Sequence, residues 1–263
     1  MTRPYLTHEH PIRLAHRGSR VLWPENTMAA FQGAIDLGYR YLETDVHLTR
    51  DGRVVVFHDH DLERLTDGTG KVWEWPWADL RLLDAAHHWG PQEGFPRRGT
   101  GLGIPLLEEL LTTFPDCLVN IDLKQPGIEV PVAAEVARLD AEDRVLIGSF
   151  FDRRIRRFRT ASKGRVATSA GPSEVAGALV AARLGRPAAG PSDALQIPER
   201  AGRLQLVTPR LIRAAHRTGK HVHVWTVDDP SDMHRLLDLG VDGIVTDRPD
   251  LLNRVLEERE NAP

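Results

Sequence analysis

Short apolar runs recur eight times along this chain, and this pattern constrains the fold more than any other feature. The runs are Ile12–Ala15, Tyr41–Val46, Cys117–Leu123, Arg144–Ser149, Arg165–Ser169, Ala194–Ile197, Val222–Val227 and Gly243–Thr246. Most are separated by segments with helical periodicity, and such alternation predicts a parallel sheet covered by helices. Eight units in 263 residues favour a closed TIM (β/α)8 barrel over an open sheet.

Several of the intervening helices have clear ends in the sequence. Asn26 is expected to cap the first of them, because its side chain can accept a hydrogen bond from the opening turn. Glycine commonly ends a helix, since it adopts the left-handed conformation at little cost. The expected helices and their glycine stops are Thr27–Leu37 with Gly38, Pro209–Thr218 with Gly219, and Ser231–Leu239 with Gly240.

A ninth apolar run, Arg53–Phe57, follows the second strand after only four residues, Thr49 to Gly52. Parallel neighbours need a crossover of a dozen or more residues, so this run is expected to return as the second arm of a hairpin. If Thr49 faces Gly52, the register places His58 opposite Glu43. A slip of one residue would change the facing pairs but not the return of the arm.

The segment from about residue 62 to 113 interrupts the strand and helix rhythm. It carries a tryptophan cluster and a glycine-rich stretch, Gly99–Gly103. About fifty residues would form a small core on their own. The segment is therefore expected to be an insertion after the His58 arm, within one barrel domain that spans residues 1–263.

Composition narrows the classes of protein to which the chain can belong. The formal net charge of −3 supplies no overall field for nucleic acid or an anionic membrane. The single cysteine, Cys117, excludes an intrachain disulfide and a cysteine-based metal site. No stretch approaches 18 apolar residues, and the polar N-terminus lacks the apolar region of a secretory signal. These features predict a cytoplasmic protein without stable membrane insertion.

Candidate catalytic residues lie near the ends of the first two strands, where active sites of barrels collect. His16 can exchange a proton near neutral pH, and Arg17 has a fork of donors that suits phosphate, although the two could also be a surface pair. Glu43 and Asp45 are two apart on a strand and share a face, so a divalent cation such as Mg²⁺ or Ca²⁺ would offset their repulsion. Helix capping explains Glu25 and its neighbours, but their position allows a supporting contact.

The later strands contribute further candidates. Asp122 and Lys124 also share one face; they could be a surface ion pair, or an additional metal ligand and a cation for phosphate. Trp225 is a possible wall of the substrate pocket, and core packing explains it equally well. His47 continues the face of the acidic pair and is expected to be an exposed strand residue rather than a ligand.

Four separated blocks of the sequence resemble the glycerophosphodiester phosphodiesterase family, and they span nearly the whole chain. The blocks are Ala15-His16-Arg17-Gly18 with Pro24-Glu25-Asn26-Thr27; Glu43-Thr44-Asp45-Val46 with Leu48-Thr49-Arg50-Asp51-Gly52; Val55-Val56-Phe57-His58-Asp59; and Val224-Trp225-Thr226-Val227 with Gly243-Ile244-Val245-Thr246-Asp247.

The resemblance implies a role for each matching residue. His16 and His58 would act as general base and acid, Arg17 would hold phosphate, and Glu43 and Asp45 would bind one divalent cation. Where the family most often has Glu-x-Lys, this chain has Asp122-Leu123-Lys124. The carboxylate is kept but is one methylene shorter, which affects the position or identity of the cation.

The expected activity is metal-dependent hydrolysis of a small-molecule glycerophosphodiester to glycerol 3-phosphate and an alcohol. A lysophospholipase D-type activity would use the same residues but would need an apolar groove for the acyl chain. A non-catalytic phosphodiester-binding protein would not need both histidines and all three acids. A metal-free sugar-phosphate isomerase would place its phosphate grip in the last loops of the barrel. The sequence does not determine the alcohol, the native cation or the oligomeric state.

Overall fold

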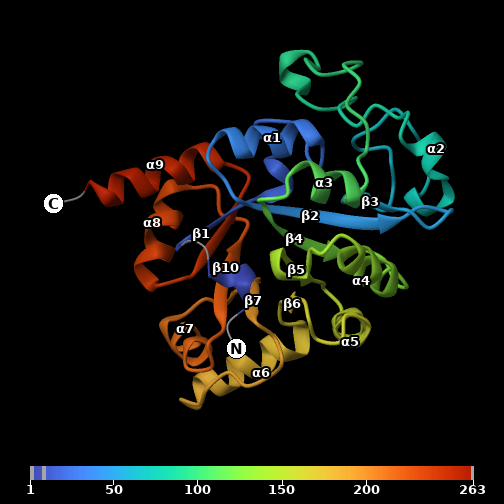
Figure 1. Ribbon diagram of the computed structural model, residues 1–263. Helices are drawn as coiled ribbons and strands as arrows, with labels where there is room; N and C mark the ends of the chain where they lie inside the picture. The colour runs from blue at the N-terminus through green and yellow to red at the C-terminus, as the bar shows by residue number, and fades with distance from the viewer. Residues whose placement is uncertain (1–2, 8–9, 262–263) are drawn as a thin grey trace.

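A computed structural model describes residues 3–7 and 10–261 of the chain and shows eight parallel strands arranged as a barrel (Figure 1). The expected TIM barrel is confirmed, with most strand ends within two residues of those predicted. The strands are β1 (Ile12–Ala15), β2 (Tyr41–Leu48), β4 (Leu118–Leu123), β5 (Val145–Gly148), β6 (Ala167–Thr168), β7 (Ala194–Pro198), β10 (His221–Trp225) and β11 (Gly243–Thr246).

The order of the strands around the barrel brings the two ends of the chain together. Neighbours follow the order β6-β5-β4-β2-β1-β11-β10-β7, and every pair along this path is parallel. The remaining seam between β6 and β7 is bridged by one parallel pair, Ser169 and Ala194. Because β1 pairs with β11, residues more than 200 positions apart in sequence lie side by side.

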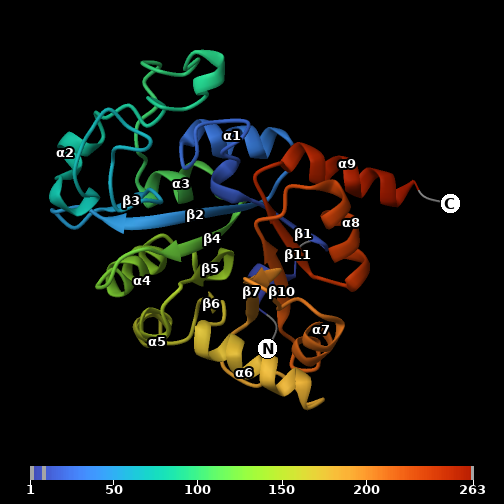
Figure 2. The same ribbon diagram turned by 180° about the vertical axis from the view of Figure 1, so that it is seen from behind.

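Helices cover the outside of the barrel, as seen from both sides in Figures 1 and 2. They are α1 (Met28–Asp36), α3 (Leu107–Thr113), α4 (Glu129–Arg138), α5 (Asp152–Ala161), α6 (Pro172–Arg183), α7 (Pro209–His216), α8 (Pro230–Leu239) and α9 (Pro249–Glu260). Gly240 ends α8 in the left-handed conformation, as expected. None of the helices described is long and apolar enough to span a bilayer.

The cap of α1 differs from the sequence-based expectation. The side chain of Thr27, not Asn26, accepts the hydrogen bond from the amide of Ala30. Asn26 instead donates to Asp45 and accepts from the hydroxyl of Thr44. Asp45, a buried carboxylate on β2, therefore binds the side chain that the local sequence predicts at the start of the helix.

The barrel interior is closed at its amino-terminal end by the start of the chain. A short 3-10 turn, η1 (Pro4–Leu6), inserts Tyr5 and Leu6 among inward-facing residues of the strands. The hydroxyl of Tyr41 donates to the carbonyl oxygen of Tyr5 at 2.7 Å. In barrels of this kind, active sites lie at the opposite, carboxyl-terminal mouth.

The hairpin arm returns as expected, but its register is shifted by one residue. Strand β3 (Val54–Val56) pairs with β2 so that Val56 faces Val46 rather than Asp45. The amide of Thr49 donates to the carbonyl of Arg53, which makes the loop three residues long. Gly52 ends this loop at φ +80°, a conformation typical of three-residue hairpin loops. The extra loop residue accounts for the shift.

The segment between β3 and α3 forms a lobe beside the barrel (Figure 1). It contains the short helix α2 (Trp77–Leu80) and the 3-10 turns η3 (Val72–Glu74) and η4 (Pro91–Glu93). Its apolar residues pack in a separate small cluster on Val55 and Phe57 of the hairpin arm, with Trp75 and Trp77 at the edge. A short hairpin, β8 (Arg200–Ala201) with β9 (Leu204–Gln205), follows β7.

We expect Glu135→Gln to stabilise the protein at alkaline pH. Burial in α4, together with the charge of Glu108, raises the pKa of Glu135 to about 7. The favourable contribution of the protonated form is complete below the unfolded pKa and is lost as pH rises through 7. Glutamine cannot ionise, so the variant should be more stable by roughly 1 kcal/mol at pH 8 after allowance for solvent screening.

Denaturant unfolding at pH 4 and pH 8 would measure this difference. The two proteins should have similar unfolding free energies at pH 4. Glu257→Gln, at an exposed position on α9, is the matched control and should change little at either pH. Equal stability of the Glu135 variant and the parent protein at pH 8 would contradict the prediction.

Candidate active site

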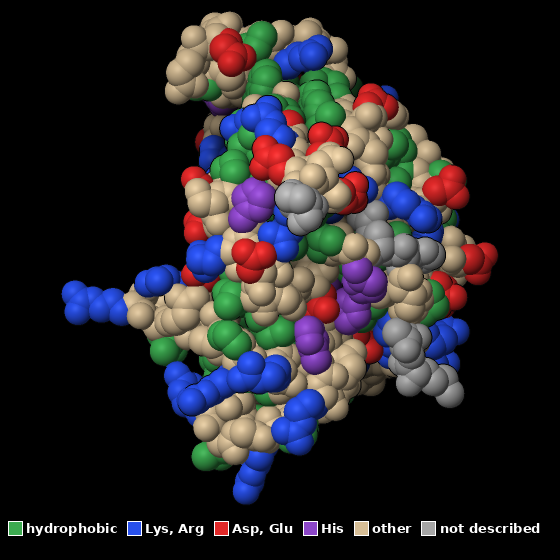
Figure 3. Space-filling model, turned by 90° about the vertical axis from the view of Figure 1, so that its left-hand side faces the viewer, with side chains coloured by type: hydrophobic (Ala, Val, Ile, Leu, Met, Phe, Trp, Pro, Cys, Tyr) green, Lys and Arg blue, Asp and Glu red, His purple; other side chains and the backbone are tan. Residues whose placement is uncertain are grey.

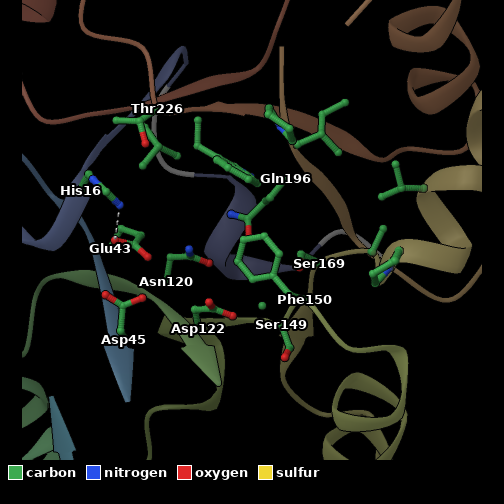
Figure 4. Close-up of a pocket in the computed structure, with 18 of the residues that line it drawn as sticks. His16, Glu43, Asp45, Asn120, Asp122, Ser149, Phe150, Ser169, Gln196 and Thr226 are labelled. Carbon is green, nitrogen blue, oxygen red and sulfur yellow. Dashed lines mark ion pairs between the residues drawn. The ribbon is translucent and has the colours of Figure 1, made fainter. Parts of the chain in front are cut away.

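A cavity with a volume of about 660 Å³ opens at the carboxyl-terminal mouth of the barrel. Figure 4 shows His16, Glu43 and Asp45 on one side of it and Phe150 on the other. All the candidate residues from the sequence line this cavity, namely His16, Arg17, Glu43, Asp45, His58, Asp122, Lys124 and Trp225.

His16 begins a 3-10 turn directly after β1, and Asp247 fixes the orientation of its ring. Nδ1 of His16 lies 2.9 Å from Oδ1 of Asp247, a fully buried carboxylate after β11. Nε2 is turned toward Glu43 at 3.9 Å. Burial lowers the pKa of His16, but the hydrogen bond to Asp247 and the charge of Glu43 outweigh it, so that the pKa lies above its ordinary value. With Nδ1–H donated to Asp247, Nε2 is the nitrogen available for proton transfer.

Arg17 is held against the acidic residues by both its backbone and its side chain. It adopts a left-handed conformation, φ +53°, in which its amide donates to Oε2 of Glu43 at 3.1 Å. Nη1 donates to Glu25 at 2.8 Å, and Nε lies 3.2 Å from Oδ2 of Asp45. The Nε–H bond does not point at Oδ2, so this contact is an ion pair and not a hydrogen bond. Nε of Arg17 is therefore a buried donor without an acceptor among the described residues.

The two acids on β2 point to the same face and have opposite electrostatic environments. Parallel pairing places Glu43 beside Asn120 of β4 and Asp45 beside Asp122. Burial and the charge of Asp45 raise the pKa of Glu43 to about 7. Burial opposes ionisation of Asp45 as well, but Lys124, Arg17 and His58 outweigh it and hold its pKa well below the ordinary value.

Lys124 neutralises two of the three acids. Its Nζ lies 2.8 Å from Oδ1 of Asp45 and 2.6 Å from Oδ2 of Asp122. Burial lowers the pKa of Lys124, but the two carboxylates outweigh it and raise the pKa above its ordinary value. Within residues 3–7 and 10–261, no three acidic, histidine or cysteine side chains are grouped as a ready-made metal site. In this arrangement the ammonium group compensates the carboxylates.

His58 lies just beyond the end of β3, and its ring is oriented by its neighbour. Nδ1 of His58 is 2.5 Å from Oδ1 of Asp59. The ring is partly exposed, with a side-chain exposure of 30% against 14% for His16. Both histidines thus have Nδ1 paired with a carboxylate, although Asp59 is the sequence neighbour of His58 and Asp247 lies 231 positions from His16.

His47 differs from the sequence-based expectation of an exposed strand residue. It is fully buried, and its Nε2 lies 3.2 Å from the carbonyl oxygen of His58. Nδ1 of His47 contacts Gln125 at 3.1 Å. Burial lowers the pKa of His47 to about 4, so the ring is neutral and supports the backbone at His58. Trp225 both lines the cavity and packs edge-on against Phe150, with ring centroids 5.5 Å apart.

Sequence reasoning missed the residues that support the candidate site. Asp247 and Asp59 both stand in the blocks that carry the family resemblance, yet no local pattern links either carboxylate to a histidine ring. Asn120 contributes a buried carbonyl oxygen that lines the cavity and has no hydrogen-bond partner in the described chain. Its place two residues before Asp122 was the only signal, because alternate residues of a strand share a face.

Figure 3 shows acidic and basic side chains interspersed over one flank of the molecule, in keeping with the formal net charge of −3. Of the remaining histidines, His60 is exposed, and the rings of His216 and His234 pair with Asp242 and Glu258. Among the described histidines, only His16 and His58 line the cavity.

Known proteins resemble this chain in both sequence and structure. It is 42% identical to the "Probable glycerophosphodiester phosphodiesterase 2" of Mycobacterium tuberculosis, over 98% of this chain and 95% of that protein. A phosphodiesterase of Oleispira antarctica in complex with the product sn-glycerol-3-phosphate superimposes with a TM-score of 0.75 at 26% identity, over 94% of this chain and 97% of that one.

A third similarity covers less of the chain. The lysophospholipase D of Rattus norvegicus is 39% identical over 111 residues, which is 42% of this chain and 35% of that protein.

Residues 16–251 match the sequence pattern of the glycerophosphoryl diester phosphodiesterase family, which spans the barrel from His16 to the start of α9. The chain belongs to the glycerophosphoryl diester phosphodiesterase family.

Proposed function

We propose that this protein hydrolyses glycerophosphodiesters to glycerol 3-phosphate and an alcohol. The observation that carries the proposal is a single cavity lined by two histidines, each with Nδ1 paired to a carboxylate, together with Arg17 and Lys124. Two proton-transfer groups beside two cations suit an anionic diester, in which one oxygen gains a proton while another loses one. The names of the relatives support the same reaction.

Arg17 and Lys124 bind the phosphate in this proposal. Nε of Arg17 is a buried donor without an acceptor, so a phosphate oxygen would satisfy it. Lys124 supplies a point charge close by, at the boundary between the acids and Phe150. Together they would orient the diester and offset charge on its non-bridging oxygens.

His16 and His58 perform the proton transfers. One of them removes a proton from the attacking water, and the other protonates the leaving alkoxide. If the 2-hydroxyl of the glycerol attacks instead, the alcohol leaves and a cyclic phosphate forms, which water must then open in a second step to give glycerol 3-phosphate. The carboxylates of Asp247 and Asp59 keep Nδ1 protonated, which leaves Nε2 of each ring to exchange the proton.

The donor set also fits a divalent cation. Glu43, Asp45 and Asp122 offer only oxygen ligands, which suits Mg²⁺ or Ca²⁺. Burial and the charge of Asp45 raise the pKa of Glu43, and a cation bound to these carboxylates would oppose both effects. These three residues would hold the ion, and a bound cation would add positive charge beside the phosphate oxygens.

The direct test is release of glycerol 3-phosphate from glycerophosphocholine by the purified protein. Release in the presence of Mg²⁺, Ca²⁺ or Mn²⁺ is the expected result. No release with any of the three ions would contradict the proposal for this substrate.

A cytoplasmic location and a single domain over residues 1–263 remain predictions from the sequence.

A second candidate substrate class is favoured by the composition of the cavity wall. One side of the cavity is apolar and is formed by Phe150, Trp225, Val175 and Leu179 of α6, Ile197 of β7, and Leu206 after β9. A hydrocarbon chain attached to the glycerol could lie along this side. Lysophospholipids would then be hydrolysed by the same residues.

We expect Leu179→Gln to distinguish the two substrate classes. Exchanging an apolar wall residue for a polar one should lower kcat/KM for lysophosphatidylcholine about tenfold and leave glycerophosphocholine turnover unchanged. Val180→Gln is the matched control, because its side chain is the next on α6, is 56% exposed and does not line the cavity. Equal effects on both substrates would exclude an acyl-chain site at Leu179.

A further inference from the structure

Arg64, at the start of the inserted lobe, joins two carboxylates that serve different parts of the candidate site. Its Nε donates to Oδ2 of Asp59, and its two terminal nitrogens donate to both oxygens of Glu25 at 3.0 and 2.8 Å. The flanking residues Leu62 and Leu65 are buried in the apolar cluster of the lobe and anchor this stretch of backbone.

Each of these carboxylates also holds a residue that lines the cavity. The other oxygen of Asp59 pairs with Nδ1 of His58, and Oε1 of Glu25 accepts from Nη1 of Arg17. The contacts therefore run without a gap from His58 through Asp59, Arg64 and Glu25 to Arg17. His58 belongs to the hairpin arm and Arg17 to the turn after β1, and no backbone hydrogen bond between those two segments is needed for the connection.

The geometry points to Arg64 as a positioning residue that sets His58 and Arg17 relative to each other, an inference that rests on the proposed phosphodiesterase function. Only a planar guanidinium presents donors in the directions needed to reach both carboxylates at once. Although the Arg64 side chain is 44% exposed, the Glu25 side chain is only 4% exposed. A two-bond contact to a buried carboxylate is more specific than an ordinary surface ion pair.

The two arms of the network predict different kinetic effects. Asp59→Asn removes the charge that orients His58, so kcat should fall while KM changes little. Glu25→Gln loosens Arg17, so KM for the diester should rise. Arg64→Met loosens both carboxylates, and both parameters should worsen, each by about 10- to 100-fold. Arg64→Lys should restore only part of the loss, because one ammonium group cannot replace the fork.

The experiment compares these variants with Arg53→Met in the glycerophosphocholine assay. Arg53 is a suitable control, since its side chain is 46% exposed and pairs with Glu108 outside the cavity. The Arg64→Met/Asp59→Asn double variant should have the same kcat as the worse single variant, because both changes act through His58. An effect of Arg64→Met no larger than that of Arg53→Met, or a lower melting temperature with unchanged kcat and KM, would overturn the inference.

A second measurement does not depend on turnover. Nitrogen-15 NMR of the histidine rings should show a shift of the His58 signals in Arg64→Met and no shift in Arg53→Met. If the parent protein failed to hydrolyse the diester while the His58 signals still moved, the proposed function would fail and the link from Arg64 to His58 would stand. Unmoved His58 signals would overturn that link whatever the activity.

Discussion

His58→Ala and His16→Ala are each expected to lower kcat for glycerophosphocholine by about 10²- to 10⁴-fold. No other described histidine lines the cavity, so none can replace the ring that is removed. Without a positioned side chain, the proton transfer then depends on water. Both variants should remain folded. Without His16, Asp247 keeps its ion pair with Arg20, and without His58, Asp59 keeps its contact with Arg64.

The controls for these variants are two histidines outside the cavity. His60→Ala lies two residues from His58, and His234→Ala removes a ring on α8 that pairs with Glu258. Both should retain most of the parent activity, and circular dichroism with thermal melting should show intact structure for all four proteins. Parent-level activity in both the His16 and the His58 variants would show that the acid–base assignment is wrong.

Removing divalent cations is expected to cost at least about a hundred-fold in kcat/KM, which corresponds to about 2.7 kcal/mol of charge stabilisation. The physical reason lies in Lys124. Without a cation, its ammonium group is shared by Asp45 and Asp122 and is not free to meet the phosphate. A cation on the carboxylates would take over their compensation and release Lys124 for the substrate.

Protein stripped with EDTA and then assayed with each ion separately would measure this effect, and calorimetric titration of the ion would measure binding without turnover. Asp45→Asn should bind Mg²⁺ or Ca²⁺ much more weakly than the parent protein. Glu135→Gln, a change to a half-buried acid that does not line the cavity, should bind as the parent does. Full activity after complete chelation would exclude a required cation.

The departure at Asp122 is relevant to the identity of that cation. The family most often has glutamate at this place, and aspartate reaches one methylene less far. Asp122 nevertheless lies beside Asp45 in the register of β2 and β4, so the carboxylate stays at the cavity. Which ion restores the stripped protein best will show how the shorter reach affects ion preference.

The barrel itself was predictable because its signals are local. Apolar runs of strand length, helices between them and glycine at helix ends are visible within windows of about ten residues, and two of the eight strands have the predicted ends. The position of Glu43 and Asp45 on one face of the strand was predictable for the same reason, since side chains alternate along any strand.

The hairpin register and the cap of α1 were mispredicted because each depends on a competing contact. Gly52 in the left-handed conformation adds one residue to the turn and shifts the pairing by one. Asn26 does not cap the helix, because its side-chain amide donates a hydrogen bond to Asp45, a buried carboxylate. A local pattern cannot decide between a nearby partner and a distant one.

The sequence by itself determined the number of units, the class of the fold and the residue types at the mouth of the barrel. Only the tertiary structure decided which partners those residues have. Pairing of β1 with β11 brings Asp247 to His16 across 231 positions, and the fold of the inserted lobe brings Arg64 to Glu25 across 39. Such contacts form because folding buries the carboxylates of Asp247 and Glu25, and a buried charge must be paired with whichever group the topology places beside it.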